Sequence, residues 1–274
     1  MTDTPDTAAP AEPAVLVDLT DGILTVTLNR PKRHNAVNGA LHDGLRDALR
    51  RAQSDEAVRV VLLRGAGRSF CSGGDVETFA QDRPAEPPSG AQVGLSVLSG
   101  RELMETMLAV EKPVVAEVRG YALGLGATIA LFADVVVVAQ DAVIADTHVN
   151  VGLVAGDGGA VAWPLLMSMG KARYYLLTGE RLSGAQAAAE GLVFEAVPAD
   201  ELAGRAREVA GKLAAIAPLA AAGTKATLNL IVRDRMNLVL EYGMMREGMT
   251  FLSDDHREAS SAFMAKREPV FRAR

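Results

Sequence analysis

The segment KPVVAEVRGYALGLGATIALFAD (residues 112–134) carries the clearest fold signal in the chain. Its apolar, β-branched run predicts a buried strand from Pro113 to Val118. The glycine-bearing turn GYALGLGA follows, and a short helix is expected to about Ala133, just before a second buried strand, DVVVVA. Strand, turn, helix and strand in this order predict a parallel, stacked β/α architecture.

A similar order of elements occurs upstream of this segment. A hairpin is expected at the start of the domain, because two β-rich runs flank Asp21-Gly22, a dipeptide favoured in tight turns. Apolar residues at helical spacing from Leu41 to Leu49 predict a helix, and VRVVLL at 58–63 predicts a buried strand before a glycine-rich loop at 65–74. A further helix is expected around 97–111. The upstream half therefore contains another β/α unit with an open end.

Downstream of Gly158 nearly every segment has helical character. Helices are expected at 171–178 and 183–190, followed by a long alanine-rich helical stretch from about Asp200 to Ile231. The C-terminal third is therefore expected to form a helical layer. The stretch QDRPAEPPSGAQ at 81–92 has the composition of a mobile surface loop, which we expect to cover a pocket and to influence its selectivity.

Composition narrows the classes of function. A formal charge of -6 and a pI near 5.3 argue against binding to nucleic acid or to an anionic membrane. The single cysteine, Cys71, can form no internal disulfide, and the four histidines show no zinc-type spacing, so we expect a reducing environment and no metal. The sequence has no secretory leader and no apolar run of about 20 residues, so a soluble, cytoplasmic protein is expected.

Two glycine-bearing turns suggest an anion-binding pocket. In SFCSGGD, Gly73 and Gly74 permit a bend that points amide groups into a pocket rather than into a β-ladder. The turn GYALGLGA precedes a helix, whose unpaired N–H groups favour negative charge. Two such donors can hold one oxygen atom. Glycine pairs also form simple turns, and in isolation that alternative is the more common one.

Four blocks together resemble the enoyl-CoA hydratase/isomerase (crotonase) superfamily. They are NRPKRHNAVN at 29–38, GAGRSFCSGGDV at 65–76, the segment at 112–134, and LLTGERLSGAQAAAEGLVFEAVP at 176–198. A C-terminal AFMAKREPVF at 262–271 is similar to the family's closing segment. Any one block would be a weak signal, but their order and spacing are specific.

The resemblance implies an α/β fold in three parts. Residues 14–200 are expected to form a crotonase-like core of stacked β-β-α spiral turns, and residues 201–274 a C-terminal helical layer used in trimerisation. Residues 1–13, rich in Pro, Ala, Thr and acidic side chains, are expected to be a disordered leader. A homotrimer, or a hexamer built as a dimer of trimers, follows from the resemblance.

The resemblance also implies an acyl-CoA thioester as substrate and assigns residues to bind it. The oxyanion hole maps to the backbone N–H groups of Gly74 and Leu125, where leucine replaces the commoner glycine without removing the donor. The candidates for CoA binding are Arg30, Lys32, Arg33 and Lys266 for the phosphates and Phe263 for adenine or pantetheine. A solvated charged face is the alternative for each basic residue. No cofactor is expected apart from CoA as part of the substrate.

The catalytic residues depart from the family's pattern. Hydratases of the family use two glutamates, and the aligned positions here hold Thr128 and His148. Threonine is a poor general base, whereas histidine, with an ordinary pKa of about 6.5, suits proton transfer near neutral pH. Asp157, in VAGDGGA, can orient that imidazole, bind water or act as the base. The chain resembles a dehalogenase and a C–C bond hydrolase of the superfamily in carrying an aspartate in this loop.

Ordinary structural roles remain alternatives at both positions. Asp157 can be the N-cap of the following helix, and His148 can be a half-exposed loop residue. Glu241 and Glu247, on the late helix, are candidates to reach a pocket by their charge alone.

Three functional hypotheses follow from these residues. The first is an acyl-CoA hydratase or isomerase of fatty acid metabolism, in which His148 and Asp157 move protons or position water. The second is a hydrolase that cleaves a C–C bond of a cyclic β-diketone with the same pair. The third is a catalytically inactive acyl-CoA-binding relative.

Overall fold

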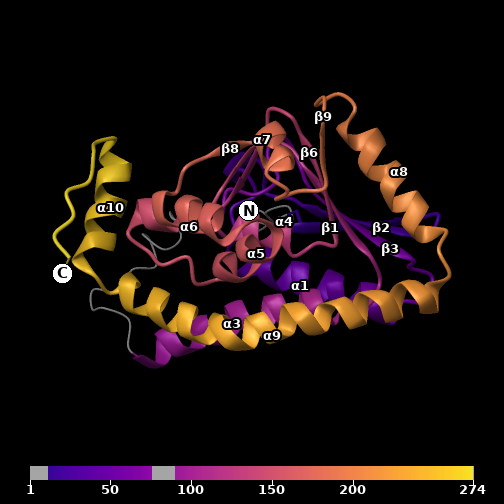
Figure 1. Ribbon diagram of the computed structural model, residues 1–274, viewed down its shortest axis with the longest axis horizontal. Coiled ribbons are helices and arrows are strands. Elements are labelled where there is room, and N and C mark those ends of the chain that lie inside the picture. Colours follow the sequence, from indigo (N-terminus) through magenta and orange to yellow (C-terminus); the bar gives the residue numbers. More distant parts are fainter. Residues whose placement is uncertain (1–11, 76–89, 274) are drawn as a thin grey trace, which may run out of the picture.

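The computed structural model describes residues 12–75 and 90–273, apart from the side chains of residues 90–98 and 263. Two β-sheets lie at its centre with helices packed around them, which confirms the mixed α/β architecture (Figure 1). The larger sheet has the strand order β1-β2-β3-β4-β6-β9, and the smaller sheet has the order β5-β7-β8.

The larger sheet is parallel except for its first pair of strands. Its strands are β1 (Val15–Thr20), β2 (Ile23–Leu28), β3 (Val60–Gly65), β4 (Val114–Val118), β6 (Val135–Ala139) and β9 (Glu195–Val197). The predicted hairpin joins β1 and β2, and Asp21 and Gly22 have the positive φ angles, 54° and 77°, that a tight hairpin turn needs. Every residue of β2 and β4 is buried, as expected of strands covered on both faces.

The smaller sheet sets the position of the functional residues. It contains β5 (Tyr121–Leu123), β7 (Val143–Ala145) and β8 (Leu182–Ser183). β5 and β7 are parallel, and Leu123 lies opposite Ala145. The N–H of Gly124 donates to the carbonyl oxygen of Ala145 at 2.9 Å. The turn before α4 (Leu125–Leu131) therefore lies beside the segment that follows β7.

Helices pack on the larger sheet and on one another. α1 (Gly39–Ser54) contacts β1 and β2, and its fully buried residues Leu41, Leu45 and Leu49 recur at the spacing of one helical face. α8 (Leu202–Ala214) packs on β3, β4 and β6, and the long α9 (Pro218–Phe251) runs along α3 (Gly90–Ala109) (Figure 1). The other helices are η1 (Pro31–Arg33), η2 (His148–Val151), α5 (Gly159–Leu166), α6 (Met169–Thr178), α7 (Gly184–Ala189) and α10 (Asp254–Ala265).

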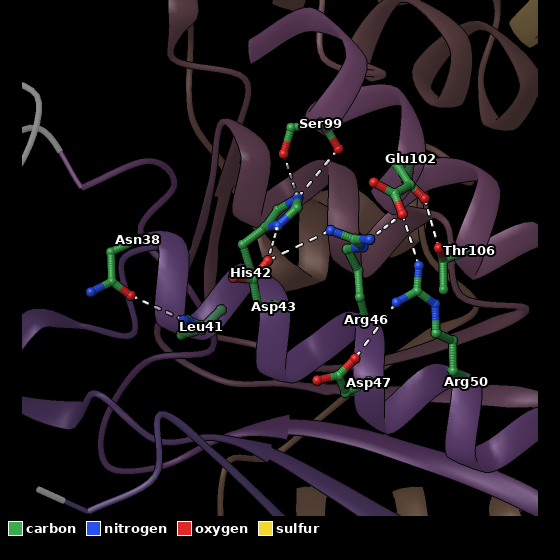
Figure 2. A network of polar contacts seen from close by, with 10 residues as sticks. All are labelled: Asn38, Leu41, His42, Asp43, Arg46, Asp47, Arg50, Ser99, Glu102 and Thr106. Carbon is green, nitrogen blue, oxygen red and sulfur yellow. Dashed lines mark hydrogen bonds and ion pairs between the residues drawn. The ribbon is translucent and has the colours of Figure 1, made fainter. Parts of the chain in front are cut away.

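A network of charged residues joins α1 to α3. Glu102 of α3 accepts hydrogen bonds from both Arg46 and Arg50 of α1, the latter at 2.8 Å (Figure 2). His42 adds a contact between Nε2 and the carbonyl oxygen of Ser99 at 3.3 Å. Because α3 also packs on α9, this network holds the helix that supports α9.

The C-terminal third is mostly helical, as expected, with two features that the sequence patterns did not show. The helical stretch expected from Asp200 to Ile231 is two helices, because α8 and α9 meet at an angle of 105°. Pro218 begins α9 and cannot continue a preceding helix, since it lacks a backbone N–H. The region after Gly158 also contains the strands β8 and β9. Both are too short for a period-two pattern to show in the sequence, and β9 is defined by its pairing with β6.

The expected leader and loop fall largely outside the described residues. Residues 1–11 of the leader and 81–89 of the expected loop are among those that the structure does not describe. In the described part of the chain, no helix alone has the length and apolar composition of a membrane span. α8 and α9 pass that test only when taken together across their bend.

Candidate active site

The two glycine-bearing turns run side by side. The N–H of Cys71 donates to the carbonyl oxygen of Tyr121 at 2.8 Å, and the N–H of Leu123 donates to that of Cys71 at 3.0 Å. On the other side of the first turn, the N–H of Val37 donates to the carbonyl oxygen of Gly73 at 2.8 Å. The first turn is therefore fixed between two neighbouring backbone segments.

A close backbone approach brings Gly73, the residue before the predicted donor Gly74, near the predicted donor Leu125. Gly73 has a φ of 97°, and a Cβ atom there would lie 2.9 Å from the carbonyl oxygen of Leu123 and 3.8 Å from the nitrogen of Leu125. Among the described residues, the N–H groups of Gly74 and Leu125 have no hydrogen-bond partner. An oxyanion hole needs two main-chain donors of this kind, and that role stays a prediction for Gly74 and Leu125.

His148, the first residue of η2, lies between two carboxylates. Its Nδ1 is 2.7 Å from Oδ1 of Asp146, and its Nε2 is 3.2 Å from Oδ2 of Asp157. All three residues are buried, with exposed fractions of 9%, 0% and 8% for His148, Asp146 and Asp157. The alternative of a half-exposed loop residue is therefore wrong for His148, and the expected proximity of His148 and Asp157 is present.

Two more side chains, from distant elements, complete this cluster. The hydroxyl of Thr128, on α4, donates to Oδ1 of Asp157 at 3.1 Å. Glu247, on α9, is buried, and its Oε1 is 3.8 Å from Nε2 of His148. We refer to Thr128, Asp146, His148, Asp157 and Glu247 as the acid–base cluster.

The acid–base cluster adjoins the turn that carries the Leu125 amide. A Cβ atom on Gly124 would lie 3.5 Å from Cε1 and 3.7 Å from Nε2 of His148. A Cβ atom on Gly158 would lie only 2.6 Å from Cγ2 of Thr128. Gly158 therefore lets the backbone approach the cluster closely, while Gly124 is favoured by its φ of 51°, so the turn that carries the Leu125 amide adjoins the cluster.

The positive charge of the cluster is on His148. Burial favours the neutral imidazole, but the carboxylates of Asp157 and Asp146 outweigh burial and raise the pKa of His148 well above 6.5. Burial likewise favours the neutral form of Asp157. The imidazolium, the Thr128 hydroxyl and the N–H of Gly159 overcome that effect and lower the pKa of Asp157. The Asp157 carboxylate is therefore ionised at neutral pH.

Glu247 has the opposite protonation state. Burial, and then the negative charge of Asp157, raise the pKa of Glu247 to about 8. It is therefore mostly a neutral carboxylic acid at pH 7. An ionised and a protonated carboxyl beside the same imidazolium provide a base and an acid within one site.

The geometry of the cluster fits proton transfer better than metal binding. Asp146, His148 and Asp157 each offer a ligand atom, and these atoms lie within 4.8 Å of one another. However, the two ring nitrogens of His148 face different carboxylates, and an imidazolium that donates from both nitrogens has no lone pair for a metal.

The residues predicted to bind CoA lie on separate elements. Arg30 pairs with Asp75 at 2.8 Å and also donates to the carbonyl oxygen of Ala36, so its guanidinium holds the loop after β2 in place. Lys32 and Arg33 are exposed on η1, and Lys266 is exposed directly after α10. Phe263 lies on α10, and its side chain is outside the described part of the structure. The binding of CoA by these residues stays a prediction.

Asp146 was not among the residues predicted from the sequence, and Glu247 was a candidate by its charge alone. The buried residues Met236, Leu240 and Met244 form a stripe along α9, and the same stripe continues to Glu247. This periodicity was the available signal. Glu241, in contrast, is exposed and pairs with Arg101 at 2.5 Å. The signal for Asp146 was weaker, namely an acidic residue directly after an apolar strand.

Comparison with known proteins identifies the family. The enoyl-CoA hydratase/isomerase family matches residues 18–274. The chain is 33% identical to 1,2-epoxyphenylacetyl-CoA isomerase of Escherichia coli (strain K12), over 94% of this chain and 97% of that protein. It is 32% identical to 2,3-dehydroadipyl-CoA hydratase of the same organism, over 95% and 99% of the two chains.

Solved structures agree with this assignment. An enoyl-CoA hydratase/isomerase from Mycobacterium paratuberculosis is similar with a TM-score of 0.83 and 33% identity, over 92% of this chain and 99% of that one. The chain therefore belongs to the enoyl-CoA hydratase/isomerase family, as the sequence motifs predict. It is an acyl-CoA enzyme of that family with a crotonase-type fold.

Proposed function

We propose that the protein is an acyl-CoA isomerase that moves a proton from one carbon of the acyl chain to another through a thioester enolate. The observation that carries this proposal is the contact of 3.2 Å between Asp157 and His148 beside the turn of the Leu125 amide. This arrangement supplies one ionised base next to the place where the thioester oxygen would bind. A proton shift needs one such group, which removes the proton and then returns it.

The proposed reaction has two steps. The thioester oxygen lies between the N–H groups of Gly74 and Leu125, and Asp157 takes a proton from a carbon next to the carbonyl or conjugated with it. The electron pair of the broken C–H bond moves onto the thioester oxygen, where the two amides stabilise the enolate. The pair then returns to a different carbon, which receives the proton from Asp157. The protonated carboxyl of Glu247 can donate to an oxygen on the acyl chain.

Hydration by two glutamates is less well supported. Thr128 occupies one of the two glutamate positions, and its hydroxyl donates to Asp157. It therefore offers no second carboxylate to hold and activate a water molecule. One of the relatives above is an isomerase by name and another is a hydratase, so the comparisons are compatible with either reaction.

Hydrolysis of a C–C bond is the second candidate. The contact between His148 and Asp157 is also suited to activating water for attack on a ketone, because the imidazolium would stay in place while the carboxylate accepts the water proton. In both candidate reactions Asp157 accepts a proton, from a carbon of the acyl chain in the isomerisation and from the attacking water in the hydrolysis. The products distinguish the two reactions.

The proposal extends to CoA binding and assembly. Lys32, Arg33 and Lys266 are the exposed basic residues proposed to meet the phosphates of CoA. Large apolar side chains are exposed on α6 and α9, including Leu177 (74%) and Leu219 (89%). We propose that a trimer, or a dimer of trimers, covers them, since exposed apolar surface of this kind marks contact sites. Sedimentation as a monomer at all concentrations would contradict this assembly.

One experiment separates the candidate reactions. The enzyme is incubated in D2O with a panel of saturated and unsaturated acyl-CoA thioesters and a cyclic β-diketone, and the products are analysed by mass spectrometry. We expect deuterium in the acyl chain and a moved double bond, without addition of water. Addition of water would identify a hydratase, and ring cleavage of the diketone a hydrolase. Binding of acyl-CoA without any of these changes would identify an inactive relative.

A further inference from the structure

Asp146 is a fully buried carboxylate of the acid–base cluster. It follows Ala145, the last residue of β7, and has no exposed surface. Its Oδ1 lies 2.7 Å from Nδ1 of His148 and also accepts the backbone N–H of His148 at 3.3 Å. A single carboxylate oxygen therefore contacts both the main chain and the ring of the same histidine.

The second oxygen of Asp146, Oδ2, gives the carboxylate no further stabilising contact, so its charge is balanced through His148 alone among the described residues. Oδ2 is buried and, among the described residues, has no hydrogen-bond partner. It faces Gly159, where an added Cβ atom would lie only 2.1 Å away. A buried carboxylate is costly unless its charge is matched, and the imidazolium of His148 is the group that matches it here.

The groups around His148 come from three sides. Asp146 follows β7, Asp157 precedes α5, and Glu247 extends from α9 with Oε1 at 3.8 Å from Nε2. Asp157 and Glu247 both approach Nε2, whereas Asp146 is at Nδ1. Asp146 is thus placed to hold the Nδ1 edge of the ring, while Nε2 faces the carboxyl groups that exchange protons.

We infer that Asp146 is a positioning residue, which fixes the imidazole of His148 with Nε2 toward Asp157 and keeps the ring positively charged. The inference rests on the proposed proton-transfer function. Without the Asp146 charge, the buried ring loses its proton more readily, and Asp157 then loses its counter-ion. A buried Asp157 without a counter-ion takes up a proton and is no longer a base.

The test uses the whole protein and the substitutions Asp146→Asn and Asp146→Ala. Asparagine can still accept the Nδ1–H, so it preserves the orientation of the ring but removes the charge, whereas alanine removes both. Glu117→Gln is the matched control, because Glu117 is a buried carboxylate on β4 paired with Arg119 at 2.7 Å. The measurements are the ¹⁵N NMR titration of His148 from about pH 6 to about pH 9 and the deuterium exchange rate of an acyl-CoA.

In the wild type and in Glu117→Gln, His148 is expected to keep both ring N–H groups through neutral pH. In Asp146→Asn it is expected to lose one within the titrated range, and kcat for exchange is expected to fall about 10²-fold with little change in KM. An unchanged His148 titration in Asp146→Asn overturns the inference. If Asp146→Asn does not fold, the wild type alone decides: deprotonation of His148 near the ordinary histidine pKa of about 6.5 overturns the inference. A shifted titration without any exchange activity in the wild type would instead contradict the proposed function.

Discussion

Asp157 lies 3.2 Å from Nε2 of His148, and this contact joins the loop before α5 to the first residue of η2. The contact explains how a buried carboxylate stays ionised, since the imidazolium matches its charge. It also links Asp157 to an imidazole that lies beside Gly124, the residue before Leu125.

The role of the Leu125 N–H can be tested without changing the fold. Leu125 is the first residue of α4, a position at which proline is tolerated because its N–H has no partner within the helix. We predict that Leu125→Pro lowers kcat about 10²- to 10³-fold, because it removes one donor to the enolate. Leu125→Ala keeps the donor and should remain much closer to the wild type. Equal rates for the two variants, measured with the same acyl-CoA, would contradict the oxyanion role.

The protonation of Glu247 predicts a dependence of rate on pH. Because the pKa of Glu247 is raised to about 8, we expect activity to decline as the pH rises through this value, where a second negative charge next to Asp157 opposes the enolate. Glu247→Gln should abolish this decline. Glu241→Gln is the control on the same helix, since Glu241 is exposed and pairs with Arg101. A decline near pH 8 that persists in Glu247→Gln would assign it to a different group.

The same residue predicts a dependence of stability on pH. Between the ordinary carboxyl pKa of 4.5 and about 8, the folded protein holds a proton that the unfolded chain releases. The contribution of Glu247 to stability is therefore greatest at low pH and falls by up to ~1.4 kcal/mol per pH unit across this window. We expect Glu247→Gln to raise the melting temperature relative to the wild type more at pH 8 than at pH 5. An equal shift at both pH values in thermal unfolding would argue against a raised pKa.

The charged network between α1 and α3 predicts a cost in stability. Glu102 accepts from both Arg46 and Arg50, whereas Asp47 makes a single longer contact of 3.6 Å with Arg50 (Figure 2). We predict that Glu102→Ala lowers the free energy of unfolding by about 1 kcal/mol, and Asp47→Ala by less. Urea denaturation measures both. A larger loss of stability in Asp47→Ala than in Glu102→Ala would show that the contacts of Glu102 do not hold α3 against α1.

Much of the fold could be predicted from local patterns in the sequence. The hairpin at Asp21-Gly22 and the buried strands β3, β4 and β6 carry their own signals in turn chemistry and β-branched runs. β9 could not be predicted in this way, because three residues show no period and are fixed only by pairing with β6. Pro218 is a sequence signal for the break between α8 and α9, but the alanine-rich composition on both sides favours a continuous helix.

The candidate site could be predicted only in part, for a physical reason. Thr128 lies in the block at 112–134, and the resemblance to the family drew attention to His148 and Asp157 in the segment that follows the next strand. Asp146 and Glu247 acquire their roles from burial and from distances to His148, which depend on tertiary packing. A charged residue on a helix is usually exposed, so sequence alone could not separate Glu247 from Glu241.

The most direct test of the central claim is the deuterium exchange of an acyl-CoA substrate by Asp157→Asn, compared with the wild type by mass spectrometry in D2O. We predict that exchange falls about 10²- to 10⁴-fold, because the base is lost, while binding of the acyl-CoA stays close to that of the wild type. Exchange by Asp157→Asn at the rate of the wild type would contradict the assignment of Asp157 as the group that moves the proton.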